Sequence, residues 1–230
     1  MICRYKMKCN FTHSHYAEIL QMYLDAGYKF YTFNEHPQNL MSFDTKVVFL
    51  RHDIDNSLER ALKLASIESS ICIKSTYFIR LHATMYNPFS YPSIKIVKEL
   101  LEHGHEIGIH YEPGLIDNES LVGLVDRMIT ELTMMEVNYD TGIRSISTHE
   151  PRMEKHKVTK DLLKLISLKH NAYSDKFTKD MKYISDSSIV PISKGRWREG
   201  CMCQHIGKYD KMQILMHPIL WYKDTSLENY

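Results

Sequence analysis

Short apolar segments alternate with amphipathic ones along most of the chain, and this alternation constrains the fold more than any other feature. The apolar segments have the length and composition of buried strands, while the segments between them carry apolar residues at helical spacing. Strands separated by helices form a mostly parallel sheet, which is either open or closed into a barrel. Strands are expected at residues 47–50, 76–79, 106–109, 144–147, 172–173, 183–184 and 212–216.

The beginning of the chain predicts a helix that precedes these strands. Thr12 is a suitable N-cap for a segment with apolar residues on one face, and Gly27 is placed to end it. We therefore expect residues 1–45 to form a helical lead-in packed on a barrel of residues 46–230. A chain of 230 residues is long enough for a single domain of this kind.

Composition excludes several classes of function. The chain has 29 Lys and Arg residues against 28 Asp and Glu residues, so its net charge of +1 gives no reason to expect a nucleic acid partner. No apolar run approaches the roughly 18 residues of a membrane span. The first residues contain no charged and then apolar segment of the export type. We therefore expect a cytoplasmic protein without an integral membrane segment, and the oligomeric state stays open.

Cysteine and histidine usage directs the search for chemistry. Five scattered cysteines, an odd number, predict free thiols in a reducing compartment. Cys201 and Cys203 form a C-x-C pair, but no second pair accompanies them, so the sequence gives little support for a metal site there. The 13 histidines point instead to metal or acid/base chemistry elsewhere.

Acidic residues and histidines recur where the expected strands end. In a parallel sheet or barrel these ends lie on one face, so residues distant in the sequence meet in one active site. Two carboxylates and three histidines at the ends of four separate strands are the main candidates: Asp53, Asp55, His110, His149 and His217. Asp175 and Asp186 follow two weaker strands.

Each candidate also has a purely structural interpretation. Asp55 is a suitable N-cap for the next helix, and Asp53 is placed to pair with Arg51. The three histidines have similar interpretations as hydrogen-bonded core or loop residues. The recurrence at separate strand ends favours a shared site over five independent structural roles.

Four segments carry a family resemblance: Arg51-His52-Asp53-Ile54-Asp55, Ser75-Thr76-Tyr77-Phe78, Gly104-His105-Glu106-Ile107-Gly108-Ile109-His110 and Leu215-Met216-His217-Pro218. In this order they resemble the polysaccharide deacetylase family, the NodB-homology group also called carbohydrate esterase family 4. The resemblance covers residues 46–222, and residues 11–33 are similar to the lead-in of a subgroup of bacterial surface-polysaccharide biosynthesis proteins. It implies a distorted (β/α)7-type barrel and metal-dependent hydrolysis of an N-acetyl group on a sugar.

The resemblance also implies roles for individual residues. Asp53 would be the general base, Asp55 and His110 metal ligands, and His217 the general acid. Three residues would contribute to substrate binding, namely Arg152, Trp197 and Asp175, and Arg152 would also orient the base.

Two departures from the family pattern concern the metal site. Ile54 separates the two aspartates that are usually adjacent, so the base and ligand roles of Asp53 and Asp55 are open to exchange. The second metal histidine usually follows the first by four residues, where this chain has Gly114. We expect His149 to replace it as the third ligand.

An Asp, His and His set predicts a divalent ion with open positions for water and substrate. Zinc suits these donors best, and cobalt, nickel or iron would also fit. Because no export segment is found, the expected substrate is an N-acetylated sugar of a surface-polysaccharide precursor, linked to a nucleotide or a lipid.

Two other functions stay open. The missing second histidine favours a degenerate barrel that binds sugars or acts as a scaffold. A different metal hydrolase or isomerase, acting on a phosphate ester or a free sugar, is the second alternative, although no glycine-rich phosphate loop is present.

Overall fold

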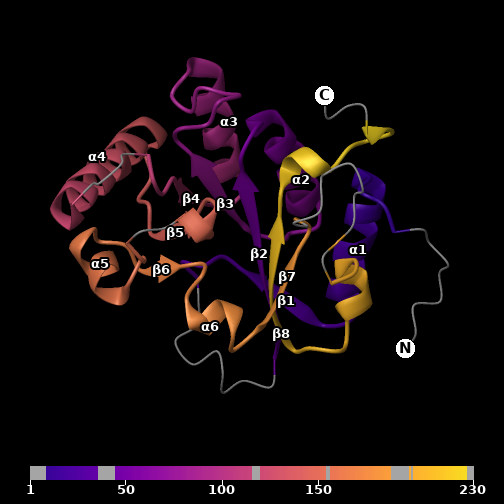
Figure 1. Ribbon diagram of the computed structural model, residues 1–230. Coiled ribbons are helices and arrows are strands. Elements are labelled where there is room, and N and C mark those ends of the chain that lie inside the picture. Colours follow the sequence, from indigo (N-terminus) through magenta and orange to yellow (C-terminus); the bar gives the residue numbers. More distant parts are fainter. Residues whose placement is uncertain are drawn as a thin grey trace.

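The computed structural model describes residues 9–35, 45–115, 120–153, 156–187, 197 and 199–226. Within them, eight strands form one sheet that curls through the middle of the molecule (Figure 1). The strands are β1 (Tyr28–Tyr31), β2 (Lys46–Ile54), β3 (Thr76–Arg80), β4 (Glu106–Tyr111), β5 (Ser145–Thr148), β6 (His170–Asn171), β7 (Lys182–Ser185) and β8 (Lys211–Met216).

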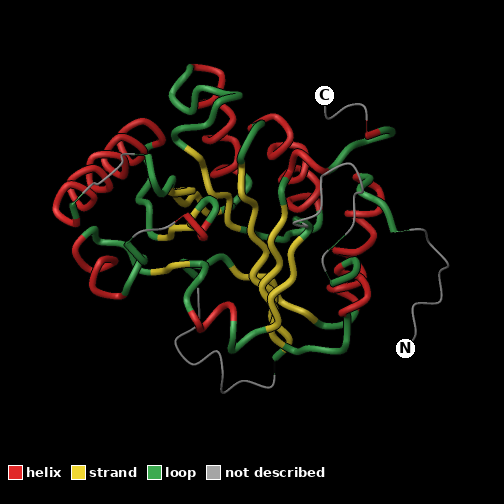
Figure 2. The backbone as a smooth tube through the Cα atoms, viewed as in Figure 1, coloured by secondary structure: helices red, strands yellow, loops and turns green. Residues whose placement is uncertain are grey.

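All the strand pairs are parallel, in the order β6-β5-β4-β3-β2-β8-β7. The helices lie outside the curled sheet, as the backbone trace shows (Figure 2). This arrangement confirms the expected single-domain (β/α)7-type barrel.

Strand β1 is an addition to the expected set. It pairs with the first half of β2, from Lys46 to Phe49, while β3 pairs with the second half, from Arg51 to Ile54. One edge of β2 therefore serves two partners in succession, because β2 is nine residues long and β1 only four. A four-residue aromatic segment is too short for periodicity to identify as a strand.

Six α-helices and three short 3-10 helices complete the described part of the chain. The α-helices are α1 (His13–Asp25), α2 (Leu58–Ser70), α3 (Tyr91–Glu102), α4 (Leu121–Tyr139), α5 (Lys160–Leu165) and α6 (Asp175–Thr178). The 3-10 helices that bear on the sites are η2 (Pro151–Met153), η4 (Met202–His205) and η5 (Pro218–Leu220). No helix among the described residues is long and apolar enough to cross a membrane.

Capping side chains explain where helices α1 and α2 begin, and they show that Asp55 is not used as a cap. The Oγ1 atom of Thr12 accepts a hydrogen bond from the His15 N–H at 3.2 Å, as expected. Ser57, and not Asp55, caps α2, since its Oγ accepts from the Arg60 N–H at 3.2 Å. The Asp55 carboxylate is therefore available for another role.

Candidate active site

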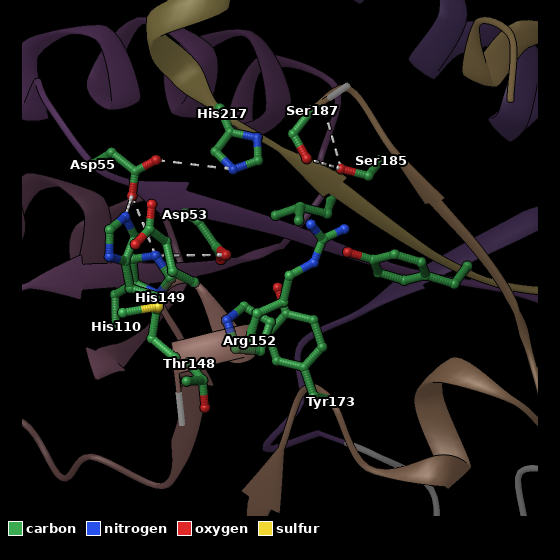
Figure 3. Close-up of a pocket in the computed structure, with 15 residues that line it drawn as sticks. Asp53, Asp55, His110, Thr148, His149, Arg152, Tyr173, Ser185, Ser187 and His217 are labelled. Atoms are coloured by element: carbon green, nitrogen blue, oxygen red, sulfur yellow. Dashed lines mark hydrogen bonds and ion pairs between the residues drawn. The ribbon is translucent and has the colours of Figure 1, made fainter. Parts of the chain in front are cut away.

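A cavity of about 640 Å³ opens at the carboxyl ends of β2, β4, β5, β7 and β8. All five main candidates line this cavity. One side of it is formed by Asp53, Asp55, His110 and His149, and His217 lies next to Asp55 (Figure 3). Strand β2 continues to Ile54, so Asp53 belongs to the strand itself and Asp55 follows it directly. The convergence expected for parallel strand ends is therefore present in the structure.

Asp55, His110 and His149 point their donor atoms at a common centre. Nε2 of His110 is 3.2 Å and Nε2 of His149 is 3.7 Å from Oδ1 of Asp55. One donor atom from each residue falls within 4.8 Å of the others. Two imidazoles and a carboxylate at this separation suit a tetrahedral divalent ion that keeps one position open.

Hydrogen bonds at Nδ1 fix the orientation of both histidine rings, so that Nε2 of each ring faces Asp55. His110 donates from Nδ1 to the carbonyl oxygen of Ser147 at 3.1 Å, and His149 donates from Nδ1 to Glu112 at 3.0 Å. Because both acceptors require a proton on Nδ1, a neutral ring leaves the Nε2 lone pair free for a metal.

Glu112 is in turn held by Arg80, whose Nε lies 2.5 Å from its Oε2. Burial works to raise the pKa of Glu112, but the hydrogen bonds from Arg80 and His149 outweigh it and lower the pKa. The carboxylate therefore stays charged and supports the His149 ring. Glu112 was not predicted from the sequence, although its place two residues after His110 puts it at the same strand end.

Asp55 provides the test of whether a cation fits. Its Oδ1 atom is buried and, among the described residues, accepts no hydrogen bond. Burial works to raise the pKa of Asp55, but His110, His217 and His149 outweigh it and lower the pKa to about 2. A charged buried oxygen needs a positive partner, and a cation bound between Asp55, His110 and His149 would supply one. The donor atoms and the charge of these three residues therefore suit a divalent ion.

Asp53 has one occupied and one available carboxylate oxygen. Oδ2 accepts hydrogen bonds from Nη2 of Arg51 at 3.0 Å and from Oγ of Ser147 at 3.1 Å. Oδ1 is buried beside the pocket and has no hydrogen-bond partner among the described residues. An anchored carboxylate with one free oxygen can accept a proton from a bound water.

The arginine that holds Asp53 is Arg51, and not Arg152 as the resemblance suggested. Arg51 is fully buried, and its guanidinium lies 4.4 Å from the centre of the Tyr173 ring. It comes from β2 itself, two residues before Asp53, so both side chains point to the same face of the sheet. The sequence already indicated this pair, because residues two apart on a strand lie on the same face.

His217 follows β8 and is held by Asp186, which follows β7. Nδ1 of His217 donates to Oδ1 of Asp186 at 2.6 Å, and the other carboxylate oxygen accepts from the His217 N–H and from Nε1 of Trp221. Burial works to lower the pKa of His217, but Asp186, Asp55 and Asp53 outweigh it and raise the pKa to about 9. His217 is therefore protonated at neutral pH, with Nε2 directed at the pocket.

The three residues expected to bind substrate are not brought together. Arg152, on η2, lines the pocket opposite the Asp55 cluster, together with Tyr173 (Figure 3). Asp175 lies outside it, because the chain turns into α6 there and the side chain, 72% exposed, pairs with Lys179. Trp197 also lies outside it and stacks on Phe11 at a centroid distance of 6.0 Å.

Gly114, four residues after His110, lies where the resemblance led us to expect a second metal histidine. Its φ of +74° is a left-handed conformation that side chains rarely adopt. The turn after β4 therefore cannot present an imidazole at this position without strain. His149, at the end of the neighbouring strand β5, occupies the space beside Asp55 instead.

Comparison with known proteins gives matches by structure only. No family model and no curated protein sequence matches the chain. A family 4 carbohydrate esterase from Bacillus anthracis aligns with a TM-score of 0.52 at 13% identity, over 88% of this chain and 76% of the esterase. The chitin deacetylase of the fungal pathogen Colletotrichum lindemuthianum aligns with a TM-score of 0.52 at 13% identity, over 75% of this chain and 74% of the deacetylase.

A CE4 family pseudoenzyme from Bacillus anthracis aligns with a TM-score of 0.54 at 14% identity, over 81% of this chain. The aligned part spans 58% of the length of that protein. At these identities the matches establish the fold, which is that of the carbohydrate esterase family 4 deacetylases. The matched structures include this pseudoenzyme and a mutant of it with restored enzymatic activity.

Proposed function

We propose that this protein is a metal-dependent hydrolase that removes the N-acetyl group, or a related acyl group, from a sugar. The observation that carries the proposal is the placement of three groups around one pocket: the converging donor atoms of Asp55, His110 and His149, the Asp53 carboxylate with one oxygen unbonded among the described residues, and the His217 imidazole held by Asp186. The likeness in fold to carbohydrate deacetylases supports the same chemistry.

Asp55, His110 and His149 would hold the ion, which when bound would polarise the acyl oxygen and acidify a water. Zinc suits this donor set best, and cobalt, nickel or iron would also serve. The other two groups would move protons. Asp53 would accept a proton from the attacking water on Oδ1, while Arg51 and Ser147 hold Oδ2 in place.

His217 would donate its Nε2 proton to the departing sugar nitrogen as the carbon–nitrogen bond breaks. The products are acetate and a free amino sugar, so one water is consumed for each amide bond. Asp186 would keep the imidazole oriented and charged throughout the reaction.

The substrate class is proposed from the setting of the pocket. Arg152 and Tyr173 offer a cation and an aromatic face opposite the metal ligands, which suits a sugar that carries phosphate. We propose an N-acetylated precursor of a bacterial surface polysaccharide, linked to a nucleotide or a lipid and met in the cytoplasm.

Acetate release is the direct test of this function. The zinc- or cobalt-loaded protein is expected to release acetate from at least one member of a panel of nucleotide-linked N-acetyl sugars and N-acetylglucosamine oligomers. His149→Ala is expected to lose the ion bound by Asp55 and to lose turnover with it, because only two donors would remain. Metal content is measured by elemental analysis beside acetate release.

A degenerate, sugar-binding barrel is the second candidate, favoured by Gly114 in the place of the usual histidine. It predicts glycan binding without acetate release and without a tightly bound ion at Asp55. The same panel, followed by binding measurements, separates the two functions.

Asp186→Asn provides a prediction about pH. The asparagine oxygen can still accept from Nδ1 of His217, but the negative charge that helps to raise the His217 pKa to about 9 is gone. Because His217 donates only when protonated, activity is lost as pH rises through this pKa. We expect the alkaline limb of kcat/KM to move to lower pH by about one unit or more. An unchanged limb would contradict the role of His217 as the acid.

A further inference from the structure

A second group of metal-type ligands lies outside the pocket, where the beginning and the end of the described chain meet. It consists of Cys9, His15, Cys201 and Cys203, and one donor atom from each falls within 4.8 Å of all the others. Cys9 is exposed and the other three are buried. Three cysteines and one histidine are a donor set typical of structural zinc sites.

The distances within this group match a tetrahedral ion. Zinc–sulfur bonds of about 2.3 Å imply sulfur atoms about 3.8 Å apart on the edge of a tetrahedron. The sulfur atoms of Cys9 and Cys203 are 3.7 Å apart. A zinc–nitrogen bond of about 2.0 Å implies a sulfur-to-nitrogen edge of about 3.5 Å, and Sγ of Cys201 lies 3.5 Å from Nε2 of His15.

The distance between the sulfur atoms of Cys9 and Cys203 also argues against a disulfide. A disulfide requires sulfur atoms about 2.05 Å apart, whereas Cys9 and Cys203 are separated by 3.7 Å and the four cysteines of the described chain are free.

Local structure holds three of the four donors, His15, Cys201 and Cys203, in place. His15 lies in the first turn of α1, which Thr12 caps, and its Nδ1 faces Glu18 at 3.9 Å, so that Nε2 is left to face the sulfurs. Cys201 directly precedes η4 and Cys203 lies within it, so a short turn fixes the two cysteines relative to each other. The three inner donors are buried, and Cys9 alone of the four is exposed.

We propose that Cys9, His15, Cys201 and Cys203 bind a zinc ion, a structural site distinct from the one in the pocket. Soft thiolate donors select zinc over the hard cations. With four protein ligands the site has no open position, so it takes no part in the reaction.

The ion would join the lead-in to the C-terminal part of the fold. Cys9 and Cys203 are 194 residues apart in sequence. Just beyond Cys9, Phe11 packs on Trp221 at a centroid distance of 5.1 Å, and Phe11 and His13 exchange backbone hydrogen bonds with Tyr222. Trp221 donates to Asp186, the residue that holds His217. The ion would therefore stabilise the packing of Phe11 on Trp221, and Trp221 in turn helps to hold Asp186 beside His217.

Metal content in single-site variants tests the proposal. Tag-free protein is purified in reductant without chelator, supplied with zinc and desalted. We expect about two zinc ions per chain in the wild type, and about one in Cys203→Ser and in Cys9→Ser. Asp55→Asn should lose the other ion and keep this one. Cys72→Ser is the matched control, since Cys72 is exposed and lies outside the group.

Cobalt gives a readout that does not depend on the variants folding well. Cobalt bound to thiolates is expected to show an intense near-ultraviolet charge-transfer band and the visible absorption of a tetrahedral centre, in the wild type, Cys72→Ser and Asp55→Asn. The proposal is overturned if the wild type shows no thiolate band, if Cys9→Ser retains the full zinc content, or if mass spectrometry finds a disulfide between Cys9 and Cys203.

Discussion

Replacing Asp53 with Asn is expected to lower acetate release by a factor of about 10² to 10⁴ while the ion at Asp55 stays bound. The amide has the shape of the carboxylate, and its oxygen can still accept from Arg51, but it cannot take a proton from the attacking water. The Oδ1 atom that would take it is buried beside the pocket without a hydrogen-bond partner among the described residues. Initial rates of acetate release and metal content, measured on the same preparations, check this result.

An exposed aspartate supplies the matched control. Asp161 lies on α5 with its side chain 89% exposed, so Asp161→Asn makes the same chemical change away from the pocket. It should leave both rate and metal content unchanged. Near-normal turnover in Asp53→Asn would remove Asp53 from the role of base, and loss of the ion in that variant would make it a ligand instead.

Replacing Glu68 with Ala is expected to lower the free energy of unfolding by about 3–5 kcal/mol. Glu68, on α2, is fully buried and lies 2.8 Å from Nε2 of His52. It also accepts hydrogen bonds from Ser75 at 2.5 Å, from Tyr77 at 3.1 Å and from Tyr16. Without the carboxylate these buried donors lose their shared acceptor. Urea unfolding of the variant and the wild type gives the difference.

Glu99→Ala is the control for this variant, because Glu99 is an exposed residue of α3 and its loss should change stability by less than about 0.5 kcal/mol. A destabilisation of similar size in both variants would show that the Glu68 network adds nothing specific.

The Glu68 network also predicts how stability depends on pH. Burial works to raise the pKa of Glu68, but His52, His105 and Ser75 outweigh it and lower the pKa from 4.5 to about 2. A carboxylate with a depressed folded-state pKa stabilises the fold above its unfolded pKa, and this contribution is lost as pH falls towards 2. The stability gap between the wild type and Glu68→Ala should therefore narrow between pH 4.5 and 2.

The architecture could be predicted from the sequence because its causes are local. Strand and helix periodicity and the Thr12 cap are set by neighbours along the chain. The parallel topology then follows, since helices between strands leave few other connections. The positions of Asp53, Asp55, His110 and His217 at strand ends follow from the same patterns, and the structure places them around one pocket.

Errors arose where a segment was too short for periodicity to decide. Strand β1 has four residues and β6 has two, so the sequence placed no strand at the first and shifted the second by two residues. The shift put Asp175 at a strand end, whereas the chain there has already turned into α6, away from the pocket.

Only the tertiary structure decided which side chains meet across the sheet. The order and curl of the strands bring Glu112 to 3.0 Å from His149, and Asp186 to 2.6 Å from His217. The approach of the two chain ends turns a lone C-x-C pair into a four-donor group with Cys9 and His15. Such contacts depend on how elements pack in three dimensions, and a pattern of neighbouring residues carries no information about distances between elements far apart in the chain.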